Sequence, residues 1–157
     1  MIKNSLLIFL GLFMLSSCET TSMLGDSARG GGVGDGSRSS LQEYLRKEVG
    51  DIVYFETDKH NISGSAAFKL EAQANWIKST PGFSVIIEGH CDERGTREYN
   101  LALGERRANS VKEFLVSMGV KDSRIQTISY GKERPTNSGT STEAYAENRR
   151  VVTIVGE

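Results

Sequence analysis

Short runs of β-branched and aromatic residues alternate with helical segments between residues 41 and 155, and this alternation constrains the fold more than any other feature of the chain. Strands are predicted at residues 52–55, 83–87, 125–130 and 151–155. Helices are predicted at residues 41–49, from a cap at Ser63 or Ser65 to Ser79, from a cap at Thr96 to Met118, and at residues 141–148. Strands that alternate with helices in this way predict an α/β two-layer sandwich with helices packed against one sheet.

The helix expected after Thr96 has a clear apolar face. At about 100° per residue, one narrow arc is expected to face the core, and it holds Leu101, Gly104, Ala108, Val111, Leu115 and Met118. Arg107 lies at the border of this arc, whereas Arg106 lies on the solvent side. A border arginine can form an ion pair within the protein, here with Asp92 or Glu93, or it can present its guanidinium group to a ligand. The helix geometry leaves both possibilities open.

The N-terminal residues indicate export. Lys3 precedes a short apolar run that ends in Leu15-Ser16-Ser17-Cys18, and the run is too short to span a bilayer as a helix. The last four residues resemble the lipobox of bacterial lipoproteins, in which the cysteine thiol receives a diacylglycerol group. Residues 1–17 are therefore predicted to be a cleaved signal peptide and Cys18 the lipidated residue. The alternative is an ordinary secretory signal in which Cys18 is incidental.

Composition places one domain after a linker. Residues 18–40 are rich in glycine and serine and are interpreted as a lipidated N-terminus and flexible tether, followed by a folded domain at residues 41–157. The cleaved chain would carry a net charge of −2, which gives no reason to expect nucleic-acid binding. Only Cys91 remains besides Cys18, so an internal disulfide is excluded and the domain must depend on its hydrophobic core.

The segment between the second strand and the long helix holds several polar residues, because His90, Cys91, Asp92 and Glu93 follow one another there. Loops that lead from a strand into a helix often carry ligand sites. Adjacent residues on an extended segment point in opposite directions, which disfavours a metal site, and Cys91 has no spaced partner that would activate it as a nucleophile. The residues favour a binding protein without a cofactor over an enzyme.

The same segment carries a family resemblance. Residues 89–108 (GHCDERGTREYNLALGERRA) are similar to the signature of the OmpA-like peptidoglycan-binding domain, and three further motifs follow the same family: VYF at residues 53–55 with Asp58, SYGKERP at residues 129–135 and NRRV at residues 148–151. The resemblance covers about residues 50–155 and implies a βαβαβ-type domain with helices on a mixed sheet.

This resemblance implies a ligand and a place in the cell. The ligand is the meso-diaminopimelate stem peptide of peptidoglycan, and the implied partners are TolB and the other Tol proteins, in a lipoprotein of the outer membrane that faces the periplasm and works in envelope integrity and cell division. The resemblance assigns a diaminopimelate carboxylate to Arg107 and the ammonium group of the same side chain to Asp92. The other pocket positions that it implies are Asp58, Thr57, Leu103 and Glu93. Sorting to the outer membrane also agrees with Glu19, which is not the aspartate that retains many lipoproteins at the inner membrane.

Two residues depart from the family pattern. Cys91 stands where threonine is common, and Thr57 stands where an aromatic residue is frequent. These departures motivate one alternative, a lipid-anchored protein-interaction module with weak or no wall binding. A competing hypothesis from another class is a wall hydrolase that would use Asp92, Glu93 and His90.

Overall fold

The computed structural model describes residues 35–156. The predicted signal peptide, the lipidation site at Cys18 and the first part of the predicted tether lie outside these residues. Four helices and four strands form the described part of the chain: α1 (Asp35–Tyr44), β1 (Ile52–Tyr54), α2 (Gly64–Ser79), β2 (Val85–His90), α3 (Arg97–Ser117), β3 (Ile125–Gly131), α4 (Thr142–Asn148) and β4 (Arg150–Val155). A π-helical turn (Leu45–Val49) continues α1, and a 3₁₀ turn (Asp122–Arg124) precedes β3.

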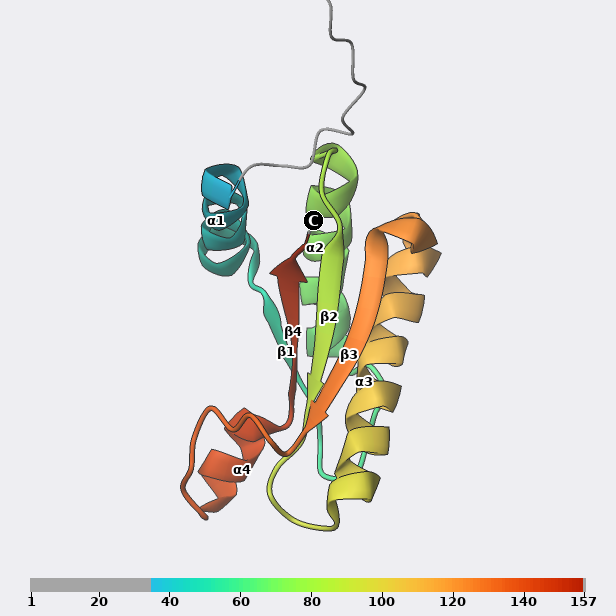
Figure 1. The fold of residues 1–157 in the computed structure, drawn as a ribbon. Coiled ribbons are helices and arrows are strands. Elements are labelled where there is room, and N and C mark those ends of the chain that lie inside the picture. The colour runs from blue at the N-terminus through green and yellow to red at the C-terminus, as the bar shows by residue number, and fades with distance from the viewer. Residues whose placement is uncertain (1–34, 157) are drawn as a thin grey trace, which may run out of the picture. The chain divides into compact units, whose positions relative to one another are not determined.

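The strands form one mixed sheet in the order β1-β4-β2-β3. Strand β4 runs antiparallel to both of its neighbours, whereas β2 and β3 run parallel and are joined by α3. Helices α2 and α3 lie side by side behind the sheet in Figure 1. This arrangement confirms the predicted α/β two-layer sandwich with a mixed sheet.

The predicted N-terminal caps of α2 and α3 are present in the structure. Thr96 caps α3, where its hydroxyl oxygen accepts a hydrogen bond from the backbone N–H of Tyr99 at 3.2 Å. Ser63, rather than Ser65, caps α2 through the backbone N–H of Ala66 at 3.2 Å. A cap of this kind satisfies a backbone donor that the first helical turn leaves without a partner.

No helix within residues 35–156 is long and apolar enough to cross a membrane.

The first helix begins earlier than expected. It starts at Asp35 instead of residue 41, so residues 35–40 are helical and the prediction that they belong to the flexible tether was wrong. Tertiary contacts hold this helix: the side chain of Gln42 accepts a hydrogen bond from the backbone N–H of Val155 at 2.7 Å, and the ring of Tyr44 stacks on Trp76. Composition alone could not reveal contacts that lie so far apart in sequence.

The core fills the space between the sheet and its two main helices. Its most deeply buried apolar residues are Leu45, Leu70, Ala74, Ile77, Val85, Ile87, Ala108, Val111 and Leu115. Helix α3 approaches β2 most closely where Gly104 meets Gly89: a Cβ atom added to Gly89 would lie 1.9 Å from the carbonyl oxygen of Gly104. The close approach of these two backbones sets the height of α3 above the sheet.

The apolar face of α3 differs from the prediction near its N-terminus. Leu101 is 50% exposed, although it was expected in the core, and Leu103 and Arg107 are buried instead. The backbone of Leu101 lies over β3, where its carbonyl accepts a hydrogen bond from the Ser129 hydroxyl at 2.7 Å. Because β3 is the edge strand, no further strand covers the Leu101 side chain.

Candidate functional site

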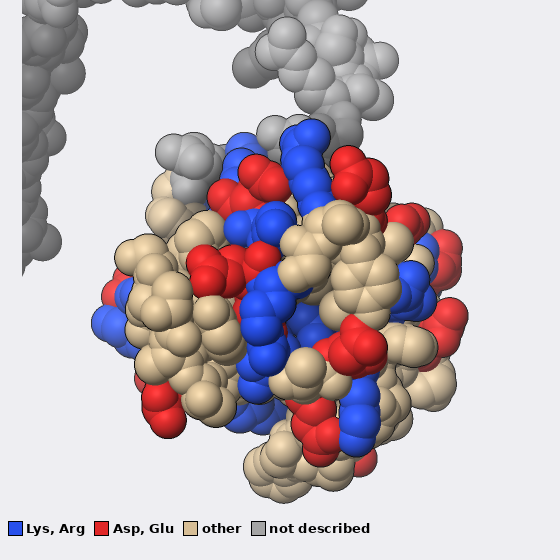
Figure 2. Space-filling view, turned by 90° about the horizontal axis from the view of Figure 1, so that it is seen from below, with Lys and Arg blue, Asp and Glu red and all other residues tan. Residues whose placement is uncertain are grey.

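A cavity of about 280 Å³ lies where β2 leads into α3. Its walls come from the loop after β1, the loop before α3, the first turns of α3 and the end of α4, and they contain Thr57, Asp58, Cys91, Asp92, Arg94, Gly95, Tyr99, Asn100, Leu103, Arg107 and Arg149. Acidic and basic side chains are mixed across this end of the molecule, as Figure 2 shows from below. The cavity therefore offers both charges to a ligand.

Five of the six predicted ligand residues line this cavity: Thr57, Asp58, Asp92, Leu103 and Arg107. The sixth, Glu93, is not part of the lining. Its carboxylate instead accepts a hydrogen bond from the hydroxyl of Tyr145 at 2.8 Å. Glu93 thus connects the loop to α4 rather than to the cavity, and its predicted role as a pocket residue loses its structural support.

Asp92 is the buried acid of the site, with 7% of its surface exposed. One carboxylate oxygen accepts hydrogen bonds from the backbone N–H and Nε of Arg94, both at 3.1 Å. The other accepts from Nη2 of Arg94 at 2.7 Å and from Nη1 of Arg149 at 3.3 Å. Burial opposes ionisation of Asp92, but the hydrogen bonds from the two arginines outweigh it and lower the pKa of this carboxyl group. Asp92 is therefore a carboxylate at neutral pH.

Arg107 is fully buried, and its guanidinium group is held by the main chain. Nε donates to the carbonyl oxygen of Lys59 at 2.8 Å, Nη1 to that of His90 at 2.8 Å, and Nη2 to that of Glu56 at 3.0 Å. Burial lowers the pKa of Arg107, from a value so high that the side chain stays charged at neutral pH. The ion pair with Asp92 or Glu93, which the helix geometry left possible, does not form within residues 35–156, because backbone carbonyl groups bind three of the guanidinium donors.

One N–H group of Arg107 has no partner among the described residues. A guanidinium group has five N–H donors; three bind carbonyl oxygens, and a fourth lies on Nη1, 3.5 Å from the sulfur of Cys91. The fifth, on Nη2, has no recorded partner among the described residues. Arg107 is thus first a structural residue that joins the loop after β1 to β2, and it also brings a positive charge and one donor to the cavity wall.

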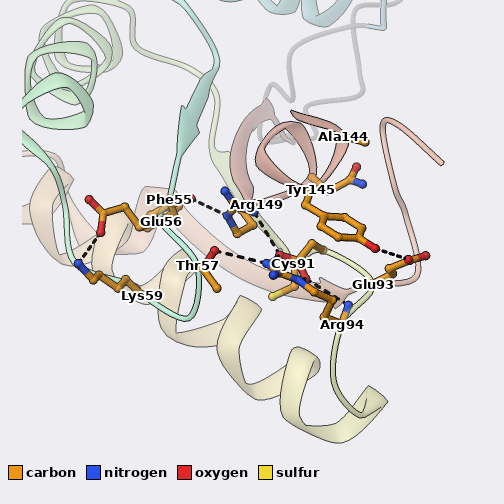
Figure 3. Close-up of polar contacts among 12 residues, drawn as sticks. Phe55, Glu56, Thr57, Lys59, Cys91, Glu93, Arg94, Ala144, Tyr145 and Arg149 are labelled. Atoms are coloured by element: carbon orange, nitrogen blue, oxygen red, sulfur yellow. Dashed lines mark hydrogen bonds and ion pairs between the residues drawn. The ribbon is translucent and has the colours of Figure 1, made fainter. Parts of the chain in front are cut away.

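Arg149 is a site residue to which sequence reasoning gave no role. Its Nε donates to the carbonyl oxygen of Phe55 at 3.1 Å, while Nη1 reaches Asp92, so it links the end of α4 to both loops (Figure 3). The family motif at residues 148–151 contained the signal, but spacing alone could not show that a residue so distant in sequence would return to Asp92.

Arg94 is part of the cavity wall. Besides its contacts with Asp92, it donates from Nη2 to the hydroxyl of Thr57 at 3.3 Å, and its guanidinium carbon lies 4.8 Å from the ring centre of Tyr145 (Figure 3). Its side chain is 48% exposed. Arg94 was expected only as part of a motif, and the structure makes it the immediate partner of the site's acid.

The loop that carries these groups has its own supports. Lys132 donates to the carbonyl oxygens of Glu93 and Gly95 at 3.0 and 2.7 Å. The side-chain amide of Asn100, buried in the first turn of α3, donates to the carbonyl oxygens of Arg94 and Thr96 at 2.8 and 3.0 Å. These contacts hold the backbone of the loop from both sides, independently of the Arg94 side chain.

Cys91 forms part of the cavity floor. It is 3% exposed, and its thiol donates to the carbonyl oxygen of Asn100 at 3.3 Å. Burial raises the pKa of this thiol, which keeps it protonated and unreactive at neutral pH. The Cys91 thiol donates one hydrogen bond, which a threonine hydroxyl could also donate, and it otherwise packs like a small apolar residue.

The remaining wall pairs Asp58 with Tyr99. Asp58 has a positive φ of 60°, and its carboxylate accepts a hydrogen bond from the hydroxyl of Tyr99. Leu103 is 4% exposed and forms the apolar part of the wall. No group of three or more His, Cys, Asp or Glu residues that could hold a metal ion occurs in the part of the chain that the structure describes.

His90 lies outside the cavity. Its ring is 2% exposed and stacks on Tyr130, and neither of its ring nitrogens has a hydrogen-bond partner among residues 35–156. Burial, with the positive charges of Arg150 and Arg134, lowers the pKa of His90 to about 4. The folded protein therefore keeps this side chain neutral.

This neutral histidine should make stability depend on pH. Unfolding returns the pKa of His90 to its ordinary value of 6.5, so between pH 6.5 and about 4 the unfolded chain binds a proton that the folded chain does not. Stability is therefore complete above this window and falls as the pH drops through it, by about 2 kcal/mol between pH 7 and pH 5. In urea unfolding, the stability that the His90→Phe variant loses between pH 7 and pH 5 should be smaller than that of the wild type by this amount. His60→Gln, at an exposed position, should lose as much stability as the wild type. An unchanged pH profile for His90→Phe would contradict the assignment.

Comparisons with known proteins agree with the fold. The OmpA family profile matches residues 54–149. The chain is 42% identical to the peptidoglycan-associated lipoprotein of Rhizobium meliloti (strain 1021), over 98% of this chain and 89% of the relative. It is 46% identical to the protein of that name in Agrobacterium fabrum, over 80% of this chain and 71% of the relative.

A solved structure agrees as well. The crystal structure of the peptidoglycan-associated lipoprotein from Burkholderia pseudomallei superimposes with a TM-score of 0.67 at 36% identity, covering 70% of this chain and 95% of the other. The profile match includes the cavity and the helix behind it, and the relatives align over most of the chain. The chain therefore belongs to the OmpA family.

Proposed function

We propose that this protein binds peptidoglycan without covalent attachment, through the meso-diaminopimelate residue of the stem peptide, and so tethers the outer membrane to the cell wall. The single observation that carries the proposal is the presence of one buried carboxylate, Asp92, and one buried guanidinium group, Arg107, in the wall of the same cavity. The relatives named as peptidoglycan-associated lipoproteins support an association with peptidoglycan.

The end of the diaminopimelate side chain suits this pair because it carries an ammonium group and a carboxylate on the same carbon. Asp92 would accept hydrogen bonds from the ammonium group. The remaining N–H of Arg107, in a cavity that also contains Arg149, would bind the carboxylate. Lysine lacks this carboxylate, so its binding would leave a buried donor unpaired, and such a loss costs a ligand considerable affinity.

The wider role follows from the same proposal. With a lipid on Cys18, the chain would be held in the outer membrane with its domain in the periplasm, where TolB and the other Tol proteins would be its partners in envelope integrity and cell division. The relatives' names describe a lipoprotein and not an enzyme. The cavity supports the same view, because it presents charges that complement a ligand, with Cys91 protonated and Asp92 held by two arginines.

Sedimentation with purified cell walls tests this function. Residues 35–157 contain all the described helices and strands together with the hydrophobic core, so this fragment is the appropriate soluble form. It should sediment with walls of the diaminopimelate type and be released by free diaminopimelate, and it should stay in solution with walls of the lysine type. Equal binding to both walls, or to neither, would contradict the proposal. TolB binding without wall binding would identify a protein-interaction module instead.

A further inference from the structure

In the absence of a ligand, the side chain of Arg94 forms an ion pair with Asp92. Its Nε and Nη2 contact the two carboxylate oxygens at 3.1 and 2.7 Å, in a two-point arrangement that occupies both oxygens. Asp92 has no second open face, because Arg149 approaches the same Oδ2 atom from α4 at 3.3 Å. A ligand ammonium group therefore cannot reach Asp92 while Arg94 stays in this position.

Arg94 is also the arginine of the site whose side chain can be displaced from Asp92. Its side chain is 48% exposed, compared with 12% for Arg149, and Arg107 is fully buried. Its remaining contacts are one hydrogen bond to Thr57 at 3.3 Å and a position over the ring of Tyr145. Because about half of the Arg94 side chain is exposed, its guanidinium group can return to water, and the ligand ammonium group then replaces the charge that the buried Asp92 loses. A ligand can displace Arg94 at small cost, whereas Arg107 and Arg149 are fixed to backbone carbonyl groups.

We propose that Arg94 is a latch that determines the specificity of the diaminopimelate site: it neutralises Asp92 in the free protein, and only a ligand that carries both charges compensates for its displacement. The proposal rests on the function proposed above. The ligand ammonium group takes the place of Arg94 on Asp92, and the ligand carboxylate supplies the negative charge that the displaced guanidinium group and Arg107 then face. A ligand with an ammonium group alone displaces Arg94 and leaves three arginines near one cavity with less negative charge to balance them.

Removal of the latch should leave the loop in place. The backbone N–H of Arg94 donates to Asp92 whatever the side chain is, and the carbonyl group of Arg94 accepts from Asn100. Lys132 holds the carbonyl groups on either side of this residue. The Arg94→Gln variant is therefore expected to keep the fold and to remove only the side-chain cation from Asp92.

The test compares two peptides by NMR titration, which also measures weak binding. Wild type, Arg94→Gln and Arg97→Gln are each titrated with a diaminopimelate muropeptide and with its lysine counterpart. Arg97→Gln is the matched control because it removes the same charge from a side chain that is 74% exposed and pairs with Glu133. Since an occupied site lowers apparent affinity by the fraction of free sites, Arg94→Gln should bind the lysine peptide about two- to fivefold more tightly than the Arg97→Gln control.

The affinity for the diaminopimelate peptide should change less, because Arg94→Gln also lacks the displaced guanidinium group that would face the ligand carboxylate. The selectivity for diaminopimelate over lysine should therefore fall by a similar factor in Arg94→Gln and stay unchanged in Arg97→Gln. If the variant loses diaminopimelate affinity while lysine affinity stays constant, Arg94 is a direct ligand contact and the latch is contradicted. Equal selectivity in wild type and variant contradicts it as well. If no protein binds either peptide, the wall-binding function itself fails, and the latch fails with it.

Discussion

The Arg107→Met variant should be less stable than the wild type by about 3–5 kcal/mol. The substitution keeps an unbranched side chain at a fully buried position but removes the donors that satisfy the carbonyl groups of Glu56, Lys59 and His90. Each carbonyl group left without a partner in the interior costs about 1–3 kcal/mol, and part of this cost is relieved by local rearrangement or water. Urea unfolding followed by circular dichroism measures the change.

The matched control is the neighbouring arginine. Arg106 is exposed, and the contact recorded for its guanidinium group is with the ring of Tyr99, 6.0 Å from the ring centre. Arg106→Met should change stability by no more than about 0.5 kcal/mol. If Arg107→Met is as stable as the control, the guanidinium group does not hold the loop after β1. Because Arg107 has this structural role, loss of ligand binding in an Arg107 variant is not by itself evidence for a contact with the ligand.

The Gly89→Ala variant should be less stable than the wild type by about 3 kcal/mol or more. Its Cβ atom would lie 1.9 Å from the carbonyl oxygen and 2.6 Å from the carbonyl carbon of Gly104, and both are backbone atoms of α3 that cannot rotate away. Helix α3 would have to rise from the sheet along its length, and excess volume in a packed core commonly costs 1–3 kcal/mol or more. Thermal and urea unfolding both report the effect.

Gly64→Ala is the control for this substitution. Gly64 is the first residue of α2, and a Cβ atom there would meet nothing within 4 Å. The change should therefore be within about 1 kcal/mol, and it should be stabilising because alanine restricts the unfolded chain. A Gly89→Ala protein as stable as Gly64→Ala would show that α3 does not need close contact between the two glycines.

The fold could be predicted from the sequence because its signals are local. The predicted caps, Ser63 or Ser65 for α2 and Thr96 for α3, and the strand-forming runs each act within a few residues, and the structure has caps at Ser63 and Thr96. The start of α1 could not be predicted in this way, because Gln42 and Tyr44 hold that helix through residues far along the chain. Propensity describes the isolated segment, and tertiary contacts override it.

The site was predictable in position but not in its internal bonding. Family resemblance placed Asp92, Arg107 and their neighbours together, and the cavity contains them. Which arginine pairs with Asp92 depends on side-chain directions that no spacing reveals. Helix geometry left an Asp92–Arg107 ion pair as one possibility, whereas Arg94 and Arg149 form these pairs and Arg107 binds carbonyl groups. The carbonyl groups of Glu56 and Lys59 in the loop after β1, together with that of His90 at the end of β2, explain this exchange.

Calorimetric titration of residues 35–157 with a diaminopimelate muropeptide and with its lysine counterpart tests the central claim most directly. Asp92→Asn is the decisive variant because it removes the negative charge that the ligand ammonium group needs, and Asp122→Asn is its control, since Asp122 is 70% exposed and pairs with Lys112 away from the cavity. Only the diaminopimelate peptide should bind. Its affinity should fall at least about tenfold in Asp92→Asn, as expected for the loss of a charged hydrogen bond, and should stay unchanged in Asp122→Asn. Equal binding by wild type and a folded Asp92→Asn protein would contradict the central claim.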